Sequence, residues 1–324
     1  MCSANILQGV LSISQFNNIA SINEMASLSP EKLVEMSEEN FSRQVENVAA
    51  RVSLLPGNRL VMLAGPSSSG KTTTASLLSK DIQKNGRGAK VISLDDFYRD
   101  QTEKLYFEDG TPDFETIESL DTDRITQCLS DITEKGECLL PRFSFLTRMR
   151  EKEPVHFTLE KDEIVIVEGL HALNPKITDP LDGSRLTKLY VSVSSRVMNG
   201  DKVFLTKRDI RFIRRMVRDY LFRNSKVDYT FFLWNGVRKG EDRYLFPFSH
   251  LADIRIDSFH SYEMCVLKKT ALSLLAHIEE NSPYFAPAQS LCEKLSQFVA
   301  IDKDTIPQSS LLREFVGQEE THFG

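Results

Sequence analysis

Paired cysteine motifs, long apolar runs and an excess of positive charge are all missing from this 324-residue chain. Its five cysteines (Cys2, Cys128, Cys138, Cys265 and Cys292) form no C-x-x-C pair. This excludes a zinc site or disulfide framework of the usual spacing and is typical of a reducing compartment. No run approaches the ~20 apolar residues of a membrane span, and the N-terminus lacks the basic and apolar regions of a signal peptide. We therefore expect a cytoplasmic protein.

The charge balance narrows the range of partners. A formal net charge of −6 argues against a protein that binds nucleic acid through bulk positive charge. Hydrophobic residues make up 41% of the chain, which supports a sizeable core. We expect a small-molecule ligand, with neither nucleic acid nor a membrane as partner. The oligomeric state stays open, a homo-oligomer included.

One stretch, residues 65–72, fits the phosphate-binding pattern G-x-x-x-x-G-K-[ST]. The glycines let successive backbone N–H groups turn toward phosphate oxygens, Lys71 would reach the β- and γ-phosphates, and the Thr72 hydroxyl would bind Mg²⁺. An apolar run at 60–64 predicts a strand before this phosphate loop, and residues 71–84 predict a helix after it. The residues predicted to bind nucleotide are Gly65, Pro66, Ser67, Ser68, Ser69, Gly70, Lys71, Thr72 and Thr73.

The rest of the chain alternates apolar runs and helical patterns. Runs at 91–94, 164–167 and 189–193 predict further buried strands, and residues 209–222 and 262–280 predict helices. Alternation of this kind predicts a parallel sheet with helices on both faces, the three-layer α/β fold of P-loop NTPases.

The first part of the chain carries no chemical motif. Ser29 and Pro30 are typical of an N-cap followed by proline at the first helical position, and a mixed-charge helical pattern runs from there to about Val52. We therefore divide the chain into an N-terminal helical extension at residues 1–55 and a phosphate-loop domain at residues 56–324.

Two acids stand where the second and third predicted strands end. Ligands of such sheets gather beyond the carboxyl ends of the strands. Glu168 follows four apolar residues, as a magnesium-binding carboxylate of a phosphate-loop protein does, although a solvated strand-end residue would look the same. Asp95 could accept a proton from an incoming hydroxyl, or it could merely begin a loop.

A basic helix is the second distinctive feature. Four arginines at 3-4-3 spacing share one face, with a fifth beside it and a sixth one turn beyond. Such a face is often simply solvated. Downstream of a phosphate loop, however, we interpret it as a lid that neutralises the charge of phosphoryl transfer. The six are Arg208, Arg211, Arg215, Arg218, Arg214 and Arg223.

Together these motifs resemble the uridine kinase/phosphoribulokinase family. The phosphate loop, residues 92–98, 168–171 and 214–219 occur in the family's order, and the likeness covers roughly residues 40–318. It is closest to a bacterial nucleoside kinase (uridine kinase-like) branch, in which the kinase follows a threonyl-tRNA-synthetase-like region. The resemblance implies ATP and Mg²⁺ as cofactors and makes residues 56–324 a nucleoside kinase-like domain.

The resemblance also implies catalytic roles. Asp95 matches the family's general base for the 5′-hydroxyl, and Thr72 and Glu168 match its magnesium pair. Arg215, Arg218 and Arg223 match lid arginines that grip ATP and the transferring phosphate. The catalytic set implied in this way is Asp95, Lys71, Arg218 and Arg223.

On the acceptor side the chain departs from the family pattern. Tyr98 lies where the family contacts the nucleoside, and Glu115 falls where uridine kinases hold the ribose hydroxyls with aspartate. Phe143 replaces the tyrosine, and Arg148 stands near the histidine, with which uridine–cytidine kinases read the pyrimidine. An aromatic ring is kept, so stacking on a base is retained. His171 completes the implied acceptor set.

The favoured function is therefore an ATP- and Mg²⁺-dependent kinase for a primary hydroxyl, the 5′-OH of uridine or cytidine. One alternative is a kinase of another sugar-like acceptor, as phosphoribulokinase is. The other is a regulatory NTP-binding switch, which needs no base for an acceptor alcohol and so leaves Asp95 unexplained.

Overall fold

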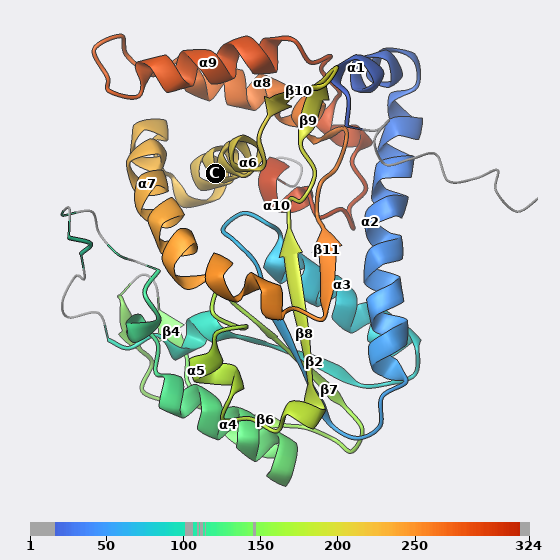
Figure 1. Ribbon diagram of the computed structural model, residues 1–324, viewed down its shortest axis with the longest axis vertical. Helices are drawn as coiled ribbons and strands as arrows, with labels where there is room; N and C mark the ends of the chain where they lie inside the picture. Colours follow the sequence, from blue (N-terminus) through green and yellow to red (C-terminus); the bar gives the residue numbers. More distant parts are fainter. Residues whose placement is uncertain are drawn as a thin grey trace, which may run out of the picture. The chain divides into compact units, whose positions relative to one another are not determined.

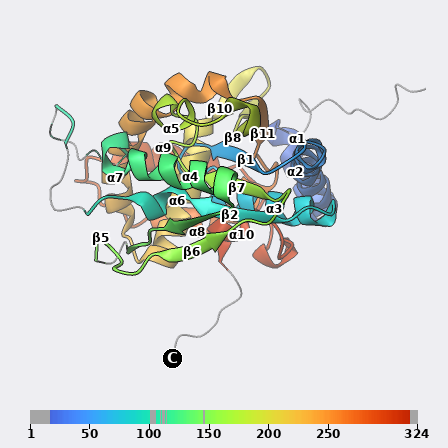
Figure 2. The same cartoon turned by 90° about the horizontal axis from the view of Figure 1, so that it is seen from below.

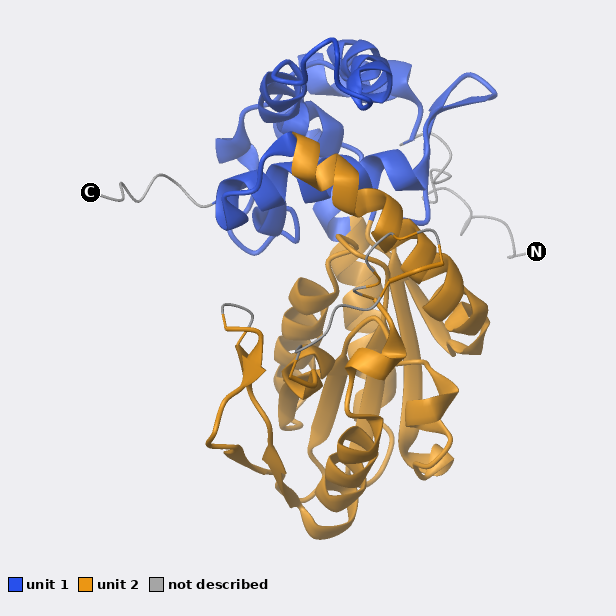
Figure 3. Cartoon of the chain, turned by 90° about the vertical axis from the view of Figure 1, so that its left-hand side faces the viewer, with its two compact units in different colours: residues 1–39, 193–227, 259–324 blue, residues 40–192, 228–258 orange. Residues whose placement is uncertain are grey.

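The computed structural model describes residues 17–100, 106–108, 110, 113, 115–144 and 147–317. The chain divides into two compact units, shown in different colours in Figure 3. Unit 1 combines residues 1–39, 193–227 and 259–324, and unit 2 combines residues 40–192 and 228–258. The phosphate loop belongs to unit 2 and the basic helix to unit 1.

Unit 2 is built on a parallel sheet. Among the described residues five strands join it, in the order β11-β8-β1-β7-β2. Figure 1 labels β11, β8, β7 and β2. They are β1 (Arg59–Ala64), β2 (Ala89–Ser93), β7 (Ile164–Glu168), β8 (Leu186–Ser192) and β11 (Ile254–Asp257). Leu63 of β1 lies level with Glu168 of β7 and with Leu189 of β8. The carboxyl ends of these strands therefore share one edge of the sheet.

Four of the strands are those that the apolar runs predict. Strand β11 is the addition, and it pairs in parallel with β8 at the edge of the sheet. Its sequence gives a weak signal, because Arg255 and Asp257 alternate with two isoleucines and no continuous apolar run results. Figure 2 views this sheet from below, with β1, β7 and β2 near the middle.

Helices α3 (Lys71–Lys84) and α4 (Thr122–Lys135) cover opposite faces of the sheet. Helix α3 connects β1 to β2, and α4 lies between β2 and β7, so the chain crosses the sheet in opposite directions. Because crossovers between parallel strands are right-handed, opposite directions put the two helices on opposite faces. Helix α3 contacts β1, β2 and β7, and α4 contacts β1. The predicted three-layer α/β fold is confirmed.

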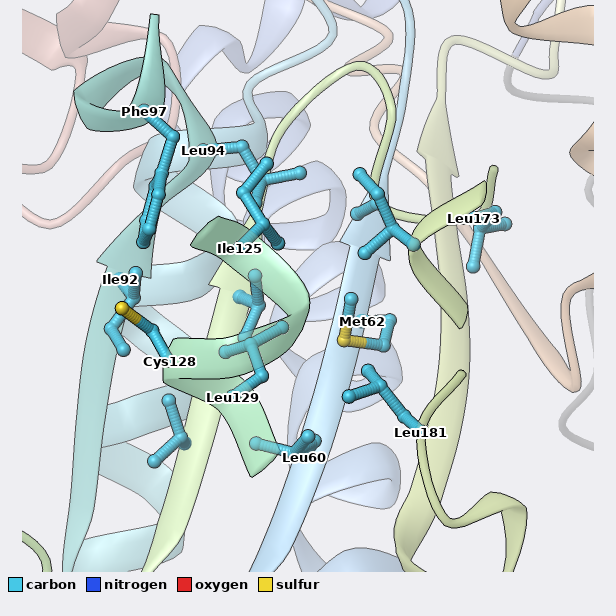
Figure 4. Packing of buried hydrophobic residues seen from close by; sticks show 14 of the residues in the cluster. Leu60, Met62, Ile92, Leu94, Phe97, Ile125, Cys128, Leu129, Leu173 and Leu181 are labelled. Atoms are coloured by element: carbon cyan, nitrogen blue, oxygen red, sulfur yellow. The ribbon is translucent and has the colours of Figure 1, made fainter. Parts of the chain in front are cut away.

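Apolar side chains fill the space between α4 and the sheet (Figure 4). Leu60 and Met62 of β1 point to the same face, because side chains alternate along a strand. They face Ile125, Cys128 and Leu129 of α4, and all five are at most 6% exposed. This cluster fixes α4 against the strand that leads into the phosphate loop.

The same cluster anchors the segment after β2. Here the 3₁₀ helix η2 (Leu94–Phe97) buries Leu94 and Phe97, while Asp95 between them is exposed. The segment after β7 packs against it so closely that a Cβ at Gly169 would lie 2.7 Å from the Leu94 Cβ. Asp95 is therefore presented to solvent from a segment that is held on both sides.

The remaining elements of unit 2 are short, apart from one long helix. They are η3 (Ile117–Ser119), β3 (Glu137–Leu140) antiparallel to β6 (Val155–Thr158), β4 (Phe143–Ser144) antiparallel to β5 (Met149–Arg150), α5 (Pro175–Thr178), η4 (Gly183–Arg185), α7 (Val227–Tyr244, in this unit from residue 228) and η5 (Phe246–Leu251).

Unit 1 is mainly helical. Its elements are α1 (Ile19–Leu28), the first part of α2 (Pro30–Ser53), β9 (Val197–Asn199) antiparallel to β10 (Lys202–Leu205), α6 (Lys207–Arg223), α8 (Glu263–Leu275), α9 (Phe285–Ser296), η6 (Lys303–Thr305) and α10 (Arg313–Val316). An ion pair with no exposed surface joins α6 to α8, where Arg214 Nε and Nη2 lie 2.6 and 3.1 Å from the two Glu263 oxygens. The Phe315 ring of α10 packs 5.1 Å from the guanidinium.

The N-terminal helices are present as predicted, and α2 begins at Pro30. Glu38 of α2 accepts hydrogen bonds from the Tyr262 and Ser310 hydroxyls within unit 1. The second half of α2 belongs to unit 2. The predicted boundary after residue 55 falls in the turn between α2 and β1 and stays a prediction. Residues 1–16 of the predicted extension lie outside the described residues.

The helix predicted at 262–280 is shorter in the structure, where α8 ends at Leu275. The N–H groups of His277 and Ile278 bond to carbonyls three residues back rather than four, so the helix tightens into a 3₁₀ turn. Pro283 follows soon after and cannot donate to a continuing helix.

We predict that Leu60→Ala lowers the free energy of unfolding by about 2–5 kcal/mol, because the removed side chain leaves a cavity between β1 and α4. Leu60 is 1% exposed, whereas Leu54 is 85% exposed. Leu54→Ala is the matched control and should change stability by less than about 0.5 kcal/mol. Urea denaturation measures both, and equal effects would show that the cluster is not packed as described.

Candidate active site

The phosphate loop joins the end of β1 to the start of α3 through left-handed backbone. Gly70 has φ 82° and Ser68 has φ 58°. Glycine adopts this region readily, and a serine held there is typical of strained backbone at ligand sites. Gly70 is also the N-cap of α3 and provides no capping side chain, so the positive end of the helix dipole faces the loop. The loop is thus a ready anion cradle.

The first glycine of the loop is required for a different reason. A Cβ at Gly65 would lie 2.2 Å from the Val191 carbonyl oxygen on β8 and 2.8 Å from the Ser69 Oγ. The neighbouring strand therefore leaves no room for any side chain at position 65. Lys71 Nζ donates to the Pro66 carbonyl at 3.3 Å, so its side chain turns back along the loop.

Glu168 stands at the carboxyl edge of the sheet, level with Leu63 of β1 and Ser93 of β2. Its Oε1 accepts hydrogen bonds from the Ser93 hydroxyl at 3.0 Å and from the Thr72 hydroxyl at 3.2 Å. Burial raises the pKa of Glu168, and the positive charge of Lys71 opposes that rise. The structure thus brings Thr72 and Glu168, the predicted magnesium pair, into contact.

Asp95 lies at the same edge, at the start of η2. Its N–H donates to the Ser93 hydroxyl at 3.3 Å, and its side chain is exposed. Its negative charge raises the pKa of Glu168 and also that of Tyr98. Asp95 is therefore within electrostatic reach of both the magnesium pair and the predicted acceptor residues.

Two aromatic rings of the predicted acceptor set lie together. The ring centroids of Tyr98 and Phe143 are 5.4 Å apart, with an angle of 47° between the rings. Burial raises the pKa of Tyr98 well above its ordinary value, and Asp95 and Glu115 raise it further. The two rings thus pack against each other, and Tyr98 lies within electrostatic reach of two acids.

His171 and Glu115 contact each other through the backbone. His171 is 4% exposed, and its Nε2 lies 2.9 Å from the Glu115 carbonyl oxygen. Burial lowers the pKa of His171 to about 4, so the ring is neutral near pH 7. Because a carbonyl can only accept, Nε2 carries the proton and Nδ1 is left as an acceptor.

Arg148 is placed apart from these contacts. It has φ 57° in the tight turn between β4 and β5, its N–H donates to the Ser144 carbonyl at 2.7 Å, and its side chain is exposed. The sequence-based role of Arg148 stays a prediction.

In unit 1, one buried carboxylate gathers the predicted lid arginines. Asp219 of α6 is 3% exposed, and its oxygens lie 3.2 Å from Arg215, 2.8 Å from Arg218 and 3.5 Å from Arg223. Arg218 also lies 3.6 Å from Glu314. Burial and the charge of Arg218 lower the pKa of Arg223. Asp219 therefore brings three guanidinium groups together at one place on α6.

The basic face is less uniform than its spacing suggests. Arg211 is 2% exposed and Arg214 is 0% exposed, and Arg214 pairs with Glu263 inside unit 1. Helix α6 thus uses part of its positive charge for packing. Its N-terminus is fixed by a capping box between Thr206 and Asp209.

Three contacting residues have no role in the sequence analysis: Ser93, Asp219 and Glu241. Ser93 lies inside the motif at residues 92–98, and Asp219 lies inside the motif at residues 214–219. Their position as polar residues within these motifs is the sequence signal that could have marked them as contact residues. Glu241 Oε1 accepts the Ser67 N–H at 2.8 Å, yet 174 positions separate the two residues. No local pattern could have found that contact.

A family model described as "Phosphoribulokinase / Uridine kinase family" matches residues 60–264, which is more than half of the chain. The chain belongs to this family. The match includes the phosphate loop, both strand-end acids and the arginines of α6, so all of the predicted site residues fall within it. The protein is accordingly a kinase of the phosphate-loop type.

Relatives carry the same family signal at low identity. The uridine kinase of Staphylococcus haemolyticus is 25% identical over 209 residues, which cover 64% of this chain and 91% of that protein. The uridine kinase of Staphylococcus aureus strain JH9 gives the same figures. A solved structure of a possible uridine kinase from Bacillus stearothermophilus is 18% identical, with a TM-score of 0.48, over 66% of this chain and 98% of that one.

The described part of the chain contains neither a metal-binding cluster of ionisable side chains nor a membrane-spanning helix. No group of three or more His, Cys, Asp or Glu side chains there is arranged to hold a metal ion. No helix there is both long and apolar enough to cross a membrane.

We predict that His171 makes stability depend on pH. The pKa of His171 is about 4 in the folded protein and about 6.5 when unfolded, so between these values the unfolded chain binds more protons. Stability therefore falls as the pH falls through this range, by about 2 kcal/mol between pH 7 and pH 5. The measurement is urea denaturation at both pH values.

The control uses the same substitution at two histidines. His171→Gln should remove this part of the pH dependence, whereas His277→Gln, at an exposed position, should leave it close to wild type. An unchanged slope in His171→Gln would contradict the prediction.

Proposed function

We propose that this protein is an ATP-dependent kinase that transfers the γ-phosphate to a primary hydroxyl, most specifically the 5′-OH of uridine or cytidine. The supporting observation is the arrangement at the carboxyl edge of the sheet, where the phosphate loop follows β1, Asp95 follows β2 and Glu168 ends β7. Phosphoryl transfer needs an anion cradle, a metal ligand and a proton acceptor in one place, and residues that could take these three roles lie together at this edge.

The donor half consists of the phosphate loop and the magnesium pair. Backbone N–H groups of the loop and Lys71 would hold the phosphates of ATP. Thr72 Oγ1 and Glu168 Oε1 are 3.2 Å apart, and hydroxyl and carboxylate oxygens are the ligand type that Mg²⁺ prefers. When bound, Mg²⁺ would neutralise charge on the β- and γ-phosphate oxygens.

Asp95 is the proposed general base. Its exposed carboxylate accepts the proton of the acceptor hydroxyl as that oxygen attacks the γ-phosphorus and the bond to ADP breaks. Burial keeps Leu94 and Phe97 fixed on either side, so the carboxylate is offered from a segment that does not need to reorganise.

On the acceptor side, Tyr98 and Phe143 would stack on the base and Glu115 would bind the ribose hydroxyls. His171 holds the Glu115 carbonyl in place, and its neutral ring leaves Nδ1 to accept from a hydroxyl. Arg148 would meet the outer edge of the base. The Phe143 ring can stack on a base but has no hydroxyl with which to hydrogen-bond it. This favours binding of several kinds of base rather than of uracil alone.

The arginine cluster of unit 1 would provide positive charge. Arg215 and Arg218 would bind the phosphates of ATP, and Arg218 and Arg223 would stabilise the transferring phosphate. Asp219 gathers all three at one place on α6, and this grouping is the support for their role.

A kinase of another sugar-like acceptor is the second candidate. The observation in its favour is Phe143, which keeps the ring but lacks the hydroxyl with which uridine–cytidine kinases read the base. Placement in the bacterial nucleoside kinase-like branch is part of the first proposal. An NTP-binding switch would differ from both in hydrolysing ATP without an acceptor.

We predict that uridine or cytidine stimulates ADP formation from ATP and Mg²⁺, and that Asp95→Asn lowers the stimulated kcat by about 10²–10⁴-fold through loss of the base. A panel of nucleosides and sugars, read out as ADP, identifies the acceptor. The exposed Asp123→Asn on α4 is the matched control and should behave as wild type.

Each outcome of this panel separates the candidates. Stimulation by a sugar but by no nucleoside selects the second candidate. ADP formation that no acceptor changes would select the switch. An Asp95→Asn enzyme that keeps most of its activity would show that another group takes the proton.

We also predict that Glu168→Gln raises the Mg²⁺ concentration for half-maximal activity by about 10- to 100-fold, because a neutral amide replaces the only charged oxygen of the magnesium pair. Initial rates at a series of Mg²⁺ concentrations measure the shift. Glu118→Gln, at an exposed position of η3, should leave the Mg²⁺ dependence unchanged. The metal assignment fails if the two variants respond alike.

A further inference from the structure

A buried carboxylate on α7 contacts the phosphate loop within the same unit (orange in Figure 3). Glu241 has no exposed surface, and its Oε1 accepts the Ser67 N–H at 2.8 Å. Burying a carboxylate is costly unless hydrogen bonds compensate. The loop N–H and the carboxylate therefore hold each other in place at the third residue of the loop.

Gly240, the residue before Glu241, contacts Glu115 of the predicted acceptor set. A Cβ at Gly240 would lie 2.4 Å from the Glu115 Cβ and 2.8 Å from its Cγ. Real side chains do not approach this closely, so position 240 accommodates only glycine while Glu115 keeps its place. The backbone of α7 and the side chain of Glu115 are thus in direct contact.

One turn further along α7, Tyr244 contacts two further residues, Asp113 and His171. Its hydroxyl donates to Asp113 Oδ2 at 2.6 Å, and its ring meets the His171 ring edge-on at 6.1 Å between centroids. His171 in turn binds the Glu115 carbonyl. Glu115 is therefore fixed through its side chain by Gly240 and through its backbone by His171.

We propose that residues 240–244 of α7 link the acceptor site to the phosphate loop, with Glu241 as a positioning residue of the loop and Gly240 as a specificity-determining position beside Glu115. The proposal rests on the proposed function, because it takes Glu115 as an acceptor contact. An acceptor that moves Glu115 must also move Gly240, since no space separates them, and Gly240 carries Glu241 with it. Such coupling is reciprocal, and we expect it to be favourable, so that the acceptor and ATP each tighten binding of the other.

The coupling is tested first by binding. Calorimetry measures the Kd of a non-hydrolysable ATP analogue with Mg²⁺ for the full chain, with and without saturating uridine. We expect uridine to tighten this Kd by about fivefold or more. Gly240→Ala should abolish the tightening and raise the KM for uridine by about tenfold or more, with a smaller change in the KM for ATP.

Gly183→Ala is the matched glycine control, because a Cβ at Gly183 meets nothing within 4 Å. It should preserve both the coupling and the KM for uridine. A Gly240→Ala enzyme with wild-type KM for uridine would overturn the role of position 240.

Glu241 is tested by a pair of substitutions that need no acceptor. The amide oxygen of glutamine can accept the same bond from Ser67, so Glu241→Gln should keep the Kd of the ATP analogue within about threefold of wild type, whereas Glu241→Ala should weaken it by about tenfold or more. If Glu241 had a purely structural role, both variants would have a lower urea midpoint. Their Kd values for the ATP analogue would then not differ from each other. The exposed Glu134→Ala is the control.

Failure of this proposal is distinct from failure of the proposed function. If wild-type protein phosphorylates uridine while uridine leaves the Kd of the ATP analogue unchanged, the link is wrong and the kinase stands. If uridine is not phosphorylated, the acceptor is wrong, and the Glu241 pair still decides the positioning role. If Gly240→Ala does not fold, the same pair decides it alone, and equal Kd values for Glu241→Ala and wild type overturn it.

Discussion

The carboxyl edge of the sheet depends on the register between β7 and its two neighbours. Because Glu168 lies level with Leu63 of β1 and Ser93 of β2, the loop after β1 and the turn after β2 both begin beside the same buried carboxylate. A slip of one residue would turn Glu168 toward the opposite face of the sheet. Thr72 and Ser93 would then lose the carboxylate oxygen that accepts both of their hydrogen bonds. The negative charge of Asp95 would no longer act on the Glu168 carboxylate.

Polar groups around this edge are arranged in pairs, each of which contains a buried side chain. Glu241 and the Ser67 N–H, Tyr244 and Asp113, and His171 and the Glu115 carbonyl each join segments that are far apart in the sequence. A polar group in the interior must find a partner, so each pair fixes a loop without an added element of secondary structure. Glycine at positions 65, 169 and 240 then lets these loops approach closely.

Most of the scaffold could be predicted from local pattern, since four strands of the sheet, α3 and the start of α2 follow from apolar runs and a cap. The positions of Asp95 and Glu168 at strand ends could be predicted from the same apolar runs. What could not be predicted depends on distant partners: β11 joins through pairing with β8 rather than through its own hydrophobicity, and Glu241 meets the loop only after α7 has folded back. The interior position of Arg211 and Arg214 likewise follows from what packs on α6, which helical spacing alone does not reveal.

Asp219 has a consequence for the charge of the cluster on α6. Three arginines that shared no carboxylate would repel one another and would hold any polyphosphate tightly. Asp219 and Glu314 offset part of that charge in advance. The guanidinium groups are therefore held in position by the protein itself before any anion arrives, and an anion that binds to them must compete with two carboxylates.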